Sequence, residues 1–357
     1  MRSGEWKMNG NTGIIYDDDY LLHDTKAHPE GKERLVVMKE KLQQLGLWQK
    51  AQIISPSLAM EEVVLAVHPK DYLMQLKEIS LSGGGRLDPD TVVSSRSYEV
   101  ALLAAGGTIK AVDQVVNGII SNCFVMARPP GHHAEAERGM GFCLLNNVAI
   151  GAKYAQQQLG LKRILIVDWD AHHGNGTEKI FYNDPSVLYF STHQSPLYPG
   201  TGFVKSSGEG EGVGYNVNVP VPRGTGDQAM YYIFTKLLVP IIEQYQPELI
   251  IISAGFDGYY QDQLAGLELT CNGFKQMTDL LLQASEKVCQ GRIVACLEGG
   301  YSLPDVGKPV AAMLAALMKK ELPDDFYARD LIKNNFLPGQ RVQIDGAIEW
   351  QRNFWNL

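Results

Sequence analysis

Residues 164–177 read ILIVDWDAHHGNGT, and this stretch decides how the rest of the chain is interpreted. Its first four residues are apolar, whereas the following ten contain two aspartates and two adjacent histidines. Short aliphatic runs of this kind are typical of strands that are covered on both faces. We therefore expect a buried strand that presents ionisable side chains at its carboxyl end.

Similar apolar runs recur along the chain, and segments of helical period lie between them. This alternation indicates an α/β fold with a parallel sheet covered by helices on both faces. The predicted strands are residues 123–127, 164–167, 187–190, 249–253 and 293–297. The predicted helices are residues 97–116, 146–159, 227–245 and 272–288. Two glycine-rich segments, 82–86 and 206–214, are interpreted as surface loops and not as linkers, so a single domain is expected over residues 1–357.

The composition is that of an ordinary globular protein, with 45% apolar residues and a net charge of -8. No run of lysine and arginine offers a surface for phosphate groups, so nucleic acid is not an expected partner. The five cysteines are scattered without a CxxC pair, which fits reduced thiols in a cytoplasmic compartment. The first residues, MRSGEWKMNGNTG, contain no apolar segment typical of a signal peptide, and no run approaches about 20 apolar residues, so no membrane association is expected. Nothing in it indicates an oligomeric state.

Each predicted strand is followed by a polar loop that contains glycine. These loops leave the carboxyl ends of the strands, which is the edge where open α/β sheets bind ligands. Four of the eight histidines lie there as two tandem pairs, His132 with His133 and His172 with His173. The chemistry of this protein is therefore expected at the carboxyl edge of the sheet.

A metal site is the most specific interpretation of the DWDAHH segment. Asp168, Asp170 and His172 are spaced by two residues, so their side chains emerge on one face if strand geometry continues through them. A carboxylate and an imidazole then lie within reach of one ion, and Asp257, after another predicted strand, is the natural third ligand. Two carboxylates and one imidazole leave positions open for water and substrate, as in catalytic zinc sites. His173 is expected to be structural, because its side chain should point away from Asp170 and His172.

Each of these residues also has a purely structural interpretation. A single aspartate such as Asp257 is usually a turn former or a helix cap. His132 and His133 could fill a polar core, and a tyrosine such as Tyr301 is more often a packing residue. The concentration of ionisable residues in residues 168–175 favours the functional interpretation.

Six segments, in order along the chain, closely resemble the zinc-dependent histone deacetylase family, in particular its class II and bacterial histone deacetylase-like amidohydrolase branch. They are RPPGHHAEAERGMGFCLLNNVAIGA, ILIVDWDAHHGNGT, LYFSTHQSPLYPGTG, YNVNVPV, SAGFDGYYQDQLAGLELT and LEGGYS. The resemblance extends over residues 14–317. It implies the arginase/deacetylase fold, with a central, mostly parallel sheet of about eight strands in which the five predicted strands would be the central part. It also implies a zinc-dependent enzyme that removes acetyl groups from acetyl-lysine in proteins or peptides.

The resemblance implies a role for each ionisable residue. The implied zinc ligands are Asp170, His172 and Asp257, in agreement with the spacing argument. The implied catalytic residues are His132, His133, Tyr301, Asp168 and Asn175. His133 would act as the general base and then as the acid for the departing amine, with His132 as its electrostatic support. Tyr301 would donate its hydroxyl to the carbonyl oxygen.

Asp168 is implied to orient His132, and Asn175 occupies the position of the partner of His133. Some members of the family carry aspartate in place of Asn175. A neutral amide supports an imidazolium less than a carboxylate does, so His133 is expected to be less basic here than in those relatives.

The resemblance also implies residues that contact the substrate and a monovalent cation. The implied lining of a narrow acyl-lysine tunnel is Gly141, Phe142 and Tyr198, with Leu264 near its mouth. A potassium or sodium ion is implied at Asp168 and Ser191, with main-chain oxygens of Asp170, His172 and Thr192. A second one is implied at Phe181, Asp184, Val187 and Tyr215.

Three other functions remain open from the sequence. An acetylpolyamine deacetylase would act on a small cationic amine, and relatives with that preference often carry glutamate where Leu264 aligns. An arginase-like two-metal hydrolase needs further bridging carboxylates, of which SAGFDG offers one. A catalytically silent acetyl-lysine binding module is disfavoured by the intact ligands, the tandem histidines and Tyr301. Relatives use an acidic residue near the tunnel rim to hold the substrate backbone, but neither Asp88 nor Asp90 can be assigned to that role.

Overall fold

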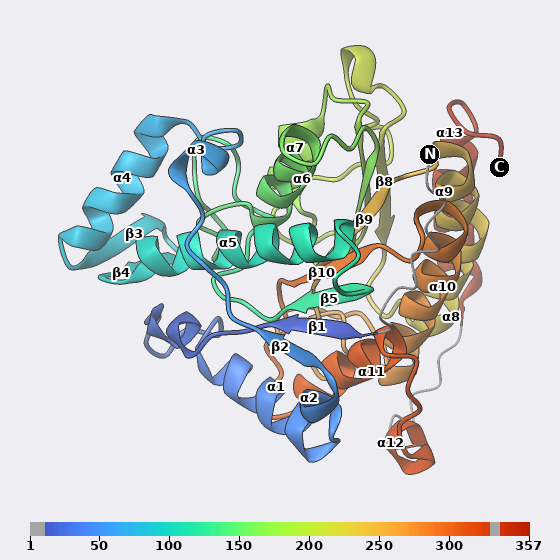
Figure 1. Cartoon of the computed structure of the whole chain (residues 1–357). Coiled ribbons are helices and arrows are strands. Elements are labelled where there is room, and N and C mark those ends of the chain that lie inside the picture. Colours follow the sequence, from blue (N-terminus) through green and yellow to red (C-terminus); the bar gives the residue numbers. More distant parts are fainter. Residues whose placement is uncertain (1–10, 329–335) are drawn as a thin grey trace, which may run out of the picture.

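The computed structural model describes residues 11–328 and 336–357. At its centre lies a sheet of eight strands in the order β2-β1-β5-β10-β9-β6-β7-β8 (Figure 1). All pairings within this sheet are parallel. The strands are β1 (Thr12–Ile15), β2 (Gln52–Ile54), β5 (Asn122–Val125), β6 (Ile164–Asp168), β7 (Val187–Gln194), β8 (Asn216–Val221), β9 (Leu249–Ala254) and β10 (Ile293–Leu297).

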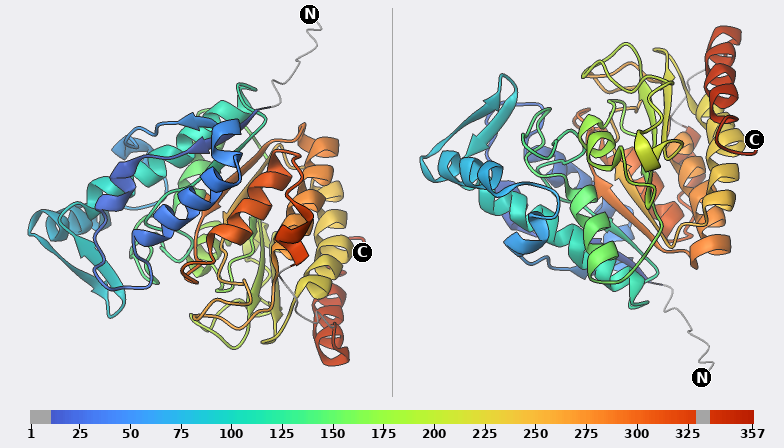
Figure 2. Two further views of the ribbon diagram at one scale, coloured as in Figure 1. Left: turned by 90° about the horizontal axis from the view of Figure 1, so that it is seen from below. Right: turned by 90° about the horizontal axis from the view of Figure 1, so that it is seen from above.

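Helices flank this sheet and separate its strands along the chain (Figure 1, Figure 2). They are α1 (Glu33–Gln44), α2 (Leu47–Lys50), α3 (Glu61–Val64), α4 (Lys70–Leu81), α5 (Ser97–Val116), α6 (Asn147–Gln157), α7 (Asn175–Phe181), α8 (Asp227–Ile233), α9 (Val239–Tyr245), α10 (Cys271–Cys289), α11 (Gly307–Leu317), α12 (Asp324–Ala328) and α13 (Pro338–Gln351). Short 3-10 helices are η1 (Asp18–Leu22) and η2 (Gly210–Gly212). Helix α5 packs against β1, β5 and β10, whereas α10 packs against β9 and the helices α8, α9 and α11.

The central strands are buried along their whole length, which explains their unbroken apolar sequences. Every residue of β6 and β9 is buried, as expected for strands with a neighbour on each side and helices above and below. Two of the helices that follow these strands, α6 and α10, begin at polar caps. The Asn146 side chain accepts from the N–H of Ala149 at the start of α6, and the Thr270 hydroxyl accepts from the N–H groups of Asn272 and Gly273 at the start of α10.

A separate antiparallel hairpin projects at one end of the molecule, together with α4 (Figure 1, Figure 2). Its strands are β3 (Gly84–Asp88) and β4 (Thr91–Ser94). The prediction that residues 82–86 form only a surface loop was therefore wrong, because Gly84 begins a strand that pairs with Ser94. The side-chain pattern did not predict this strand, because glycine has no side chain that could show the alternation of a strand.

The five predicted strands correspond to β5, β6, β7, β9 and β10, and they are adjacent in the centre of the sheet. Strand β7 is longer than predicted and continues to Gln194, so Ser191 and Thr192 lie within it and not in the loop after it. The predicted helix 227–245 has the observed outer limits but contains a π-helical turn, η3 (Phe234–Leu238), between α8 and α9. In the described part of the chain, no helix combines the length and apolar content needed to cross a membrane.

Candidate active site

The loops after five neighbouring strands meet at the carboxyl edge of the sheet. Because β5, β10, β9, β6 and β7 are adjacent and parallel, their carboxyl ends lie side by side. Segments distant in sequence are joined there directly. The N–H of Gly299 after β10 donates to Asp170 Oδ2 after β6 at 2.8 Å, and the N–H of Ala171 donates to Asp257 Oδ1 after β9 at 2.8 Å.

Asp170, His172 and Asp257 come together as a candidate metal centre. One ligand atom from each lies within 4.8 Å of the others. His172 Nδ1 is 2.7 Å from Asp257 Oδ2 and 3.2 Å from Asp170 Oδ1, and both aspartates are buried. The carboxylate of Asp168, two residues earlier, does not join this group, because it faces His132. The strand ends at Asp168, so the alternation assumed from the spacing does not continue.

The electrostatics of this group favour a bound cation. Burial acts to raise the pKa of Asp170, but the positive charge of His132 and the hydrogen bond from His172 outweigh burial and hold that pKa well below its usual range. Burial and the charge of Asp170 raise the pKa of Asp257 to about 7. Burial disfavours the charged form of His172, yet hydrogen bonds to the two aspartates raise its pKa to about 10. Two buried carboxylates thus compete for positive charge, which a divalent ion would supply.

Two glycines leave the space around the carboxylates open. A Cβ on Gly299 would lie 2.6 Å from both Asp170 Oδ2 and Asp257 Oδ2, and one on Gly255 would lie 2.1 Å from Asp170 Oδ2. Both distances are too short for any side chain to be accepted. The donor set and this cradle fit a zinc ion held by two carboxylates and one imidazole.

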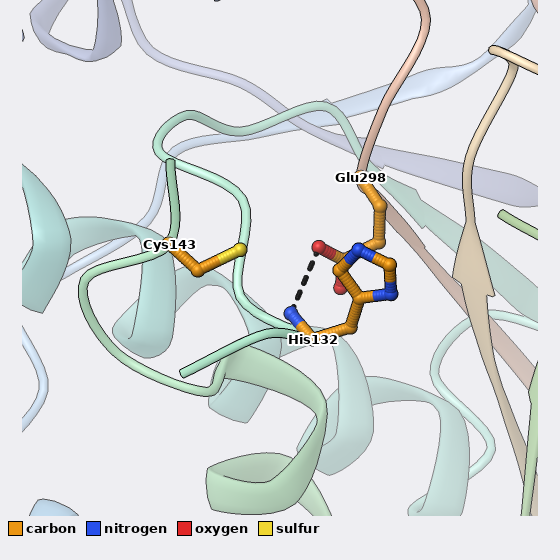
Figure 3. Close-up of side chains that lie close together, drawn as sticks. All are labelled: His132, Cys143 and Glu298. Carbon is orange, nitrogen blue, oxygen red and sulfur yellow. Dashed lines mark hydrogen bonds between the residues drawn. The ribbon is translucent and has the colours of Figure 1, made fainter. Parts of the chain in front are cut away.

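The described residues contain a second cluster of possible metal ligands, formed by His132, Cys143 and Glu298 (Figure 3). The main-chain N–H of His132 donates to Glu298 Oε2 at 3.1 Å. Burial raises the pKa of the Cys143 thiol well above its usual value, which disfavours the thiolate that a metal requires. Burial also raises the pKa of Glu298 to about 7. This cluster is therefore a poorer metal site than the group formed by Asp170, His172 and Asp257.

The tandem histidines have different partners. His132 Nδ1 is 3.1 Å from Asp168 Oδ2, whereas His133 Nδ1 is 2.9 Å from Asn175 Oδ1. The two ring centroids are 4.0 Å apart, and both side chains are buried. These are the pairs that the sequence predicted. His173 points elsewhere and contacts Thr201 and Glu178.

Burial and the neighbouring charges drive the pKa values of the two histidines apart. Burial disfavours the imidazolium of His132, but the charges of Asp170 and Asp168 outweigh it and raise its pKa to about 10. Burial, with the positive charges of His132 and His172, lowers the pKa of His133 well below its usual value. The pKa values of these two neighbouring histidines thus shift in opposite directions, a separation that is typical of acid–base sites.

A pocket of about 390 Å³ opens onto these groups. Its lining includes His133, Gly141, Phe142, His172, Tyr198, Leu264 and Tyr301. The structure therefore brings the predicted tunnel residues together with His133, His172 and Tyr301, the predicted base, one predicted metal ligand and the predicted hydroxyl donor. Asp168, Asp170, Asn175 and Asp257 do not line the pocket and lie buried behind it.

Phe142 is held in an unusual backbone conformation on the pocket wall. Its φ is 71°, a left-handed value that bulky residues rarely adopt. Its N–H donates to Thr91 Oγ1 at 3.1 Å, and its ring packs edge-on against Tyr301 at 5.7 Å between centroids. Gly141 also has positive φ, and a Cβ there would lie 2.5 Å from His133 Cδ2. The wall thus depends on Gly141 beside His133 and on the β3–β4 hairpin, which supplies Thr91.

The same hairpin brings two acidic side chains to the pocket. Asp88 and Asp90, which the sequence left unassigned, both line it, and Asp90 Oδ1 is 3.1 Å from His28 Nε2. The ring of His28 in turn packs edge-on against Phe142, with centroids 4.5 Å apart. In the sequence, the segment Asp88-Pro89-Asp90 indicated only a loop. The pairing of β3 with β4 determines where the two carboxylates lie.

Sequence reasoning also missed the residues that support Tyr301. Its N–H donates to Asp262 Oδ2 at 2.6 Å, and the other oxygen of Asp262 accepts from the N–H of Leu264 at 2.9 Å. The guanidinium of Arg34 lies over the ring of Tyr301. The ion pairs of Arg34 with Glu30, and of Glu30 with Arg128, are fully buried. The features of the sequence that could have indicated this ion cluster are Arg128 in the RPPGHH segment and Glu30 in the HPEG segment.

The residues proposed for monovalent cations occupy two places. Asp168 and Ser191 are register partners on β6 and β7, next to Thr192, whose buried hydroxyl has no hydrogen-bond partner among the described residues. The second set lies where α7 leads into β7, where the N–H of Asp184 donates to the Phe181 carbonyl and the N–H of Val187 to the Asp184 carbonyl. Tyr215 is nearby, since its carbonyl accepts from the N–H of Tyr189 on β7.

Comparison with known proteins identifies the group to which this architecture belongs. The family model described as histone deacetylase domain matches residues 28–317. A probable deacetylase of Archaeoglobus fulgidus is 45% identical over 295 residues, which are 82% of each chain. A histone deacetylase-like amidohydrolase of Pseudomonas aeruginosa is 39% identical over 275 residues, covering 77% of this chain and 72% of the relative. The crystal structure of the HDA15 HD domain superposes with a TM-score of 0.89 at 32% identity, covering 97% of this chain and 95% of the other.

Proposed function

The chain belongs to the histone deacetylase family and is an enzyme of the deacetylase type, and we propose that its substrate is acetyl-lysine in proteins or peptides. The observation that carries this proposal is one pocket whose lining joins the side chains of Phe142, Tyr198 and Leu264 with those of His133, His172 and Tyr301. An apolar wall of this kind suits the alkyl stem of a lysine side chain, and the acyl group would reach the ionisable groups at its end.

We propose Asp170, His172 and Asp257 as the ligands of one catalytic zinc ion. When bound there, zinc would polarise the acyl oxygen and lower the pKa of a bound water. The same residues could also hold ferrous iron or cobalt, because two carboxylates and one imidazole are not selective. A potassium or sodium ion is proposed at Asp168 and Ser191, with a second one at the Phe181, Asp184, Val187 and Tyr215 set.

The roles of the histidines follow from their hydrogen bonds. His133 is neutral and can accept a proton from the attacking water, and it can later return a proton to the departing amine. His132, held by Asp168, carries the positive charge that favours the developing oxyanion. The Tyr301 hydroxyl donates to that oxyanion, a contribution that is worth roughly 3 kcal/mol in comparable sites.

A small acetylated amine such as an acetylpolyamine is the second candidate substrate. Asp88 and Asp90 line the pocket and would attract a cation. The residue that we align with the glutamate of polyamine-specific relatives is Leu264, and it lines the same pocket. This apolar side chain favours the acetyl-lysine substrate over the polyamine.

The decisive experiment compares zinc-loaded wild type with Tyr301→Phe on a fluorogenic acetyl-lysine peptide and on an acetylated polyamine. We expect peptide hydrolysis, with kcat reduced by about 10²- to 10³-fold in the variant. The matched control is Tyr231→Phe, an exposed tyrosine away from the pocket, which should behave as wild type. Hydrolysis of the polyamine alone would mean that the substrate is a small acetylated amine. Hydrolysis of neither the peptide nor the polyamine would support the catalytically silent binding module.

The cellular location proposed for this enzyme is the cytoplasm. All five cysteines are buried thiols that form no disulfide with one another, the usual state in a reducing compartment.

A further inference from the structure

The side-chain amide of Asn175 lies between three groups that together determine its orientation. Its Oδ1 is 2.9 Å from His133 Nδ1. Its Nδ2 is 3.1 Å from Glu135 Oε1 and 3.4 Å from the sulfur of Met140. Asn175 itself is the first residue of α7 and is buried.

The chemistry of the two groups at Nδ2 excludes the flipped amide. A carboxylate and a thioether can only accept hydrogen bonds. If the amide of Asn175 were reversed, its oxygen would face the Glu135 oxygen at hydrogen-bond distance with no proton between them. The NH2 group must therefore face Glu135, although the O and N atoms of an amide resemble each other closely.

This orientation decides which nitrogen of His133 carries the proton. The amide oxygen of Asn175 can only accept, so the Nδ1 atom of His133 must be its donor. A neutral imidazole has one N–H, and Nε2 is then left with a free lone pair. Only this tautomer can act as a base through Nε2.

The carboxylate of Glu135 is kept as an anion by two basic residues. Lys179 Nζ donates to its Oε2 at 2.9 Å, and the guanidinium of Arg138 donates to both of its oxygens at 3.1 and 3.2 Å. Burial would raise the pKa of Glu135, but these hydrogen bonds outweigh burial and hold it below its usual value. The side chain is 12% exposed, so Glu135 links the buried base to charges at the surface.

We propose that Glu135 is a positioning residue that fixes the tautomer of His133 through Asn175. The role of His133 as base rests on the proposed function, whereas its tautomer can be measured independently. An aspartate at position 175 would impose the tautomer alone, because both of its oxygens accept. An asparagine has two orientations, and a third residue is needed to select one.

The direct test is ¹⁵N NMR of the histidine ring nitrogens in wild type and Glu135→Gln, with the His133 signals identified by their loss in His133→Asn. Wild type should show a proton on Nδ1 alone. In Glu135→Gln the new amide can donate to the Asn175 oxygen, so the flipped orientation becomes possible. The His133 signals should then report a population protonated on Nε2.

A rescue variant separates this role from a structural one. Glu135→Gln should lower kcat by at least about tenfold with little change in KM, within the range for a mispositioned general base. Adding Asn175→Asp to Glu135→Gln should restore the Nδ1 proton and bring kcat back to within about threefold of wild type, because the new carboxylate accepts from His133 directly. Asn175→Asp alone should be less active than the double variant, because two carboxylates would then face each other.

The matched control is Glu243→Gln, which removes the charge of an exposed glutamate that pairs with Lys287; its kcat should stay within about twofold of wild type. Retention of the Nδ1 proton in Glu135→Gln would overturn the inference, whatever happened to kcat. Loss of activity without rescue by Asn175→Asp would also overturn it. If wild type hydrolysed neither substrate while the tautomer still changed, the proposed function would fail and the inference about Glu135 would stand.

Discussion

The guanidinium of Arg34 lies 4.8 Å from the ring centroid of Tyr301 and donates to the carbonyl oxygens of Gly300 and Glu298, both at 2.6 Å. One buried cation thus holds the main chain on the amino-terminal side of Tyr301 and also one face of its ring. Glu30 balances this charge, with its Oε1 3.1 Å from Arg34 and 2.6 Å from Arg128. The position of the tyrosine hydroxyl therefore depends on an ion cluster that does not line the pocket.

Replacing Arg34 should reduce both stability and activity. In Arg34→Met the buried carbonyls lose their donor and Glu30 loses one partner, so the free energy of unfolding should fall by about 3–5 kcal/mol. Arg34→Lys keeps the charge but cannot serve both carbonyls, so it should lose less stability while kcat still falls. Urea unfolding and peptide hydrolysis measure the two effects. Arg352→Met, which removes an exposed ion pair with Glu349, is the control and should match wild type in both.

His68 should make the protein less stable in mild acid. Its Nδ1 donates to the Ala136 carbonyl and its Nε2 accepts from the N–H of Asn146, both at 2.9 Å, so the neutral ring is fully satisfied. Burial lowers its pKa to about 4. As the pH falls, the unfolded chain therefore binds a proton at His68 before the folded chain does. The contribution of neutral His68 to the free energy of unfolding is constant above about pH 6.5 and is lost as the pH falls towards 4.

The size of this effect is about 3 kcal/mol for one proton. Free energies of unfolding of wild type and His68→Gln should be compared by urea titration between about pH 7 and pH 4.5. The stability advantage of wild type should shrink as the pH falls, because only wild type must exclude this proton. Two curves that stay parallel over this range would show that His68 titrates normally in the folded protein.

A charge at position 264 should redirect substrate preference. Leu264→Glu adds a carboxylate to a pocket that already contains Asp88 and Asp90, so kcat/KM for an acetylated polyamine should rise by roughly 5- to 50-fold, as expected for one added charge at a partly screened site. Hydrolysis of the peptide should fall. Leu264→Gln has a similar shape without the charge and should not show the gain. An equal gain in both variants would mean that shape and not charge is responsible.

Zinc should stabilise the folded protein through Asp257. Removal of the metal with a chelator should abolish hydrolysis, and zinc at about 100 times its Kd should raise the free energy of unfolding by about 2.7 kcal/mol. Asp257→Asn should lose this increment, because a neutral amide is a poor zinc ligand. Asp279→Asn changes a half-buried carboxylate that pairs with Lys275 on α10, and this variant should keep the increment. Thermal unfolding with and without zinc measures the stabilisation of both variants by the metal, independently of their catalytic activity.

The apolar strands were predicted well, because burial on both faces leaves a strong pattern. Residues 293–297 coincide with β10, and residues 97–116 coincide with α5. Elements with weak patterns were missed. β1 (TGII), the glycine-rich β3 and the half-polar β8 (NVNVPV) were not assigned as strands, because their side chains carry little of the signal that pairing with neighbours supplies.

The candidate site divides in the same way. Residue type and spacing, together with the family resemblance, pointed to Asp170, His172, Asp257 and the tandem histidines. Neither Glu135 nor Asp262 could be distinguished from ordinary surface carboxylates. Their roles depend on which N–H group faces each oxygen, and that is a property of folded loops and not of composition.

The sequence by itself determined that this chain builds a parallel α/β sheet and that its chemistry gathers after the strands, because buried strands require apolar runs and ligands require ionisable side chains. Residue spacing alone placed Asp168 and Asp170 on one face, and only the tertiary structure explains why the two carboxylates have different partners. Asp168 and Asp170 are two residues apart, yet the first faces His132 and the second joins His172 and Asp257. The physical reason is that β6 ends at Asp168, and the turn beyond it is shaped by N–H donors such as Gly299, which come from strands distant in sequence.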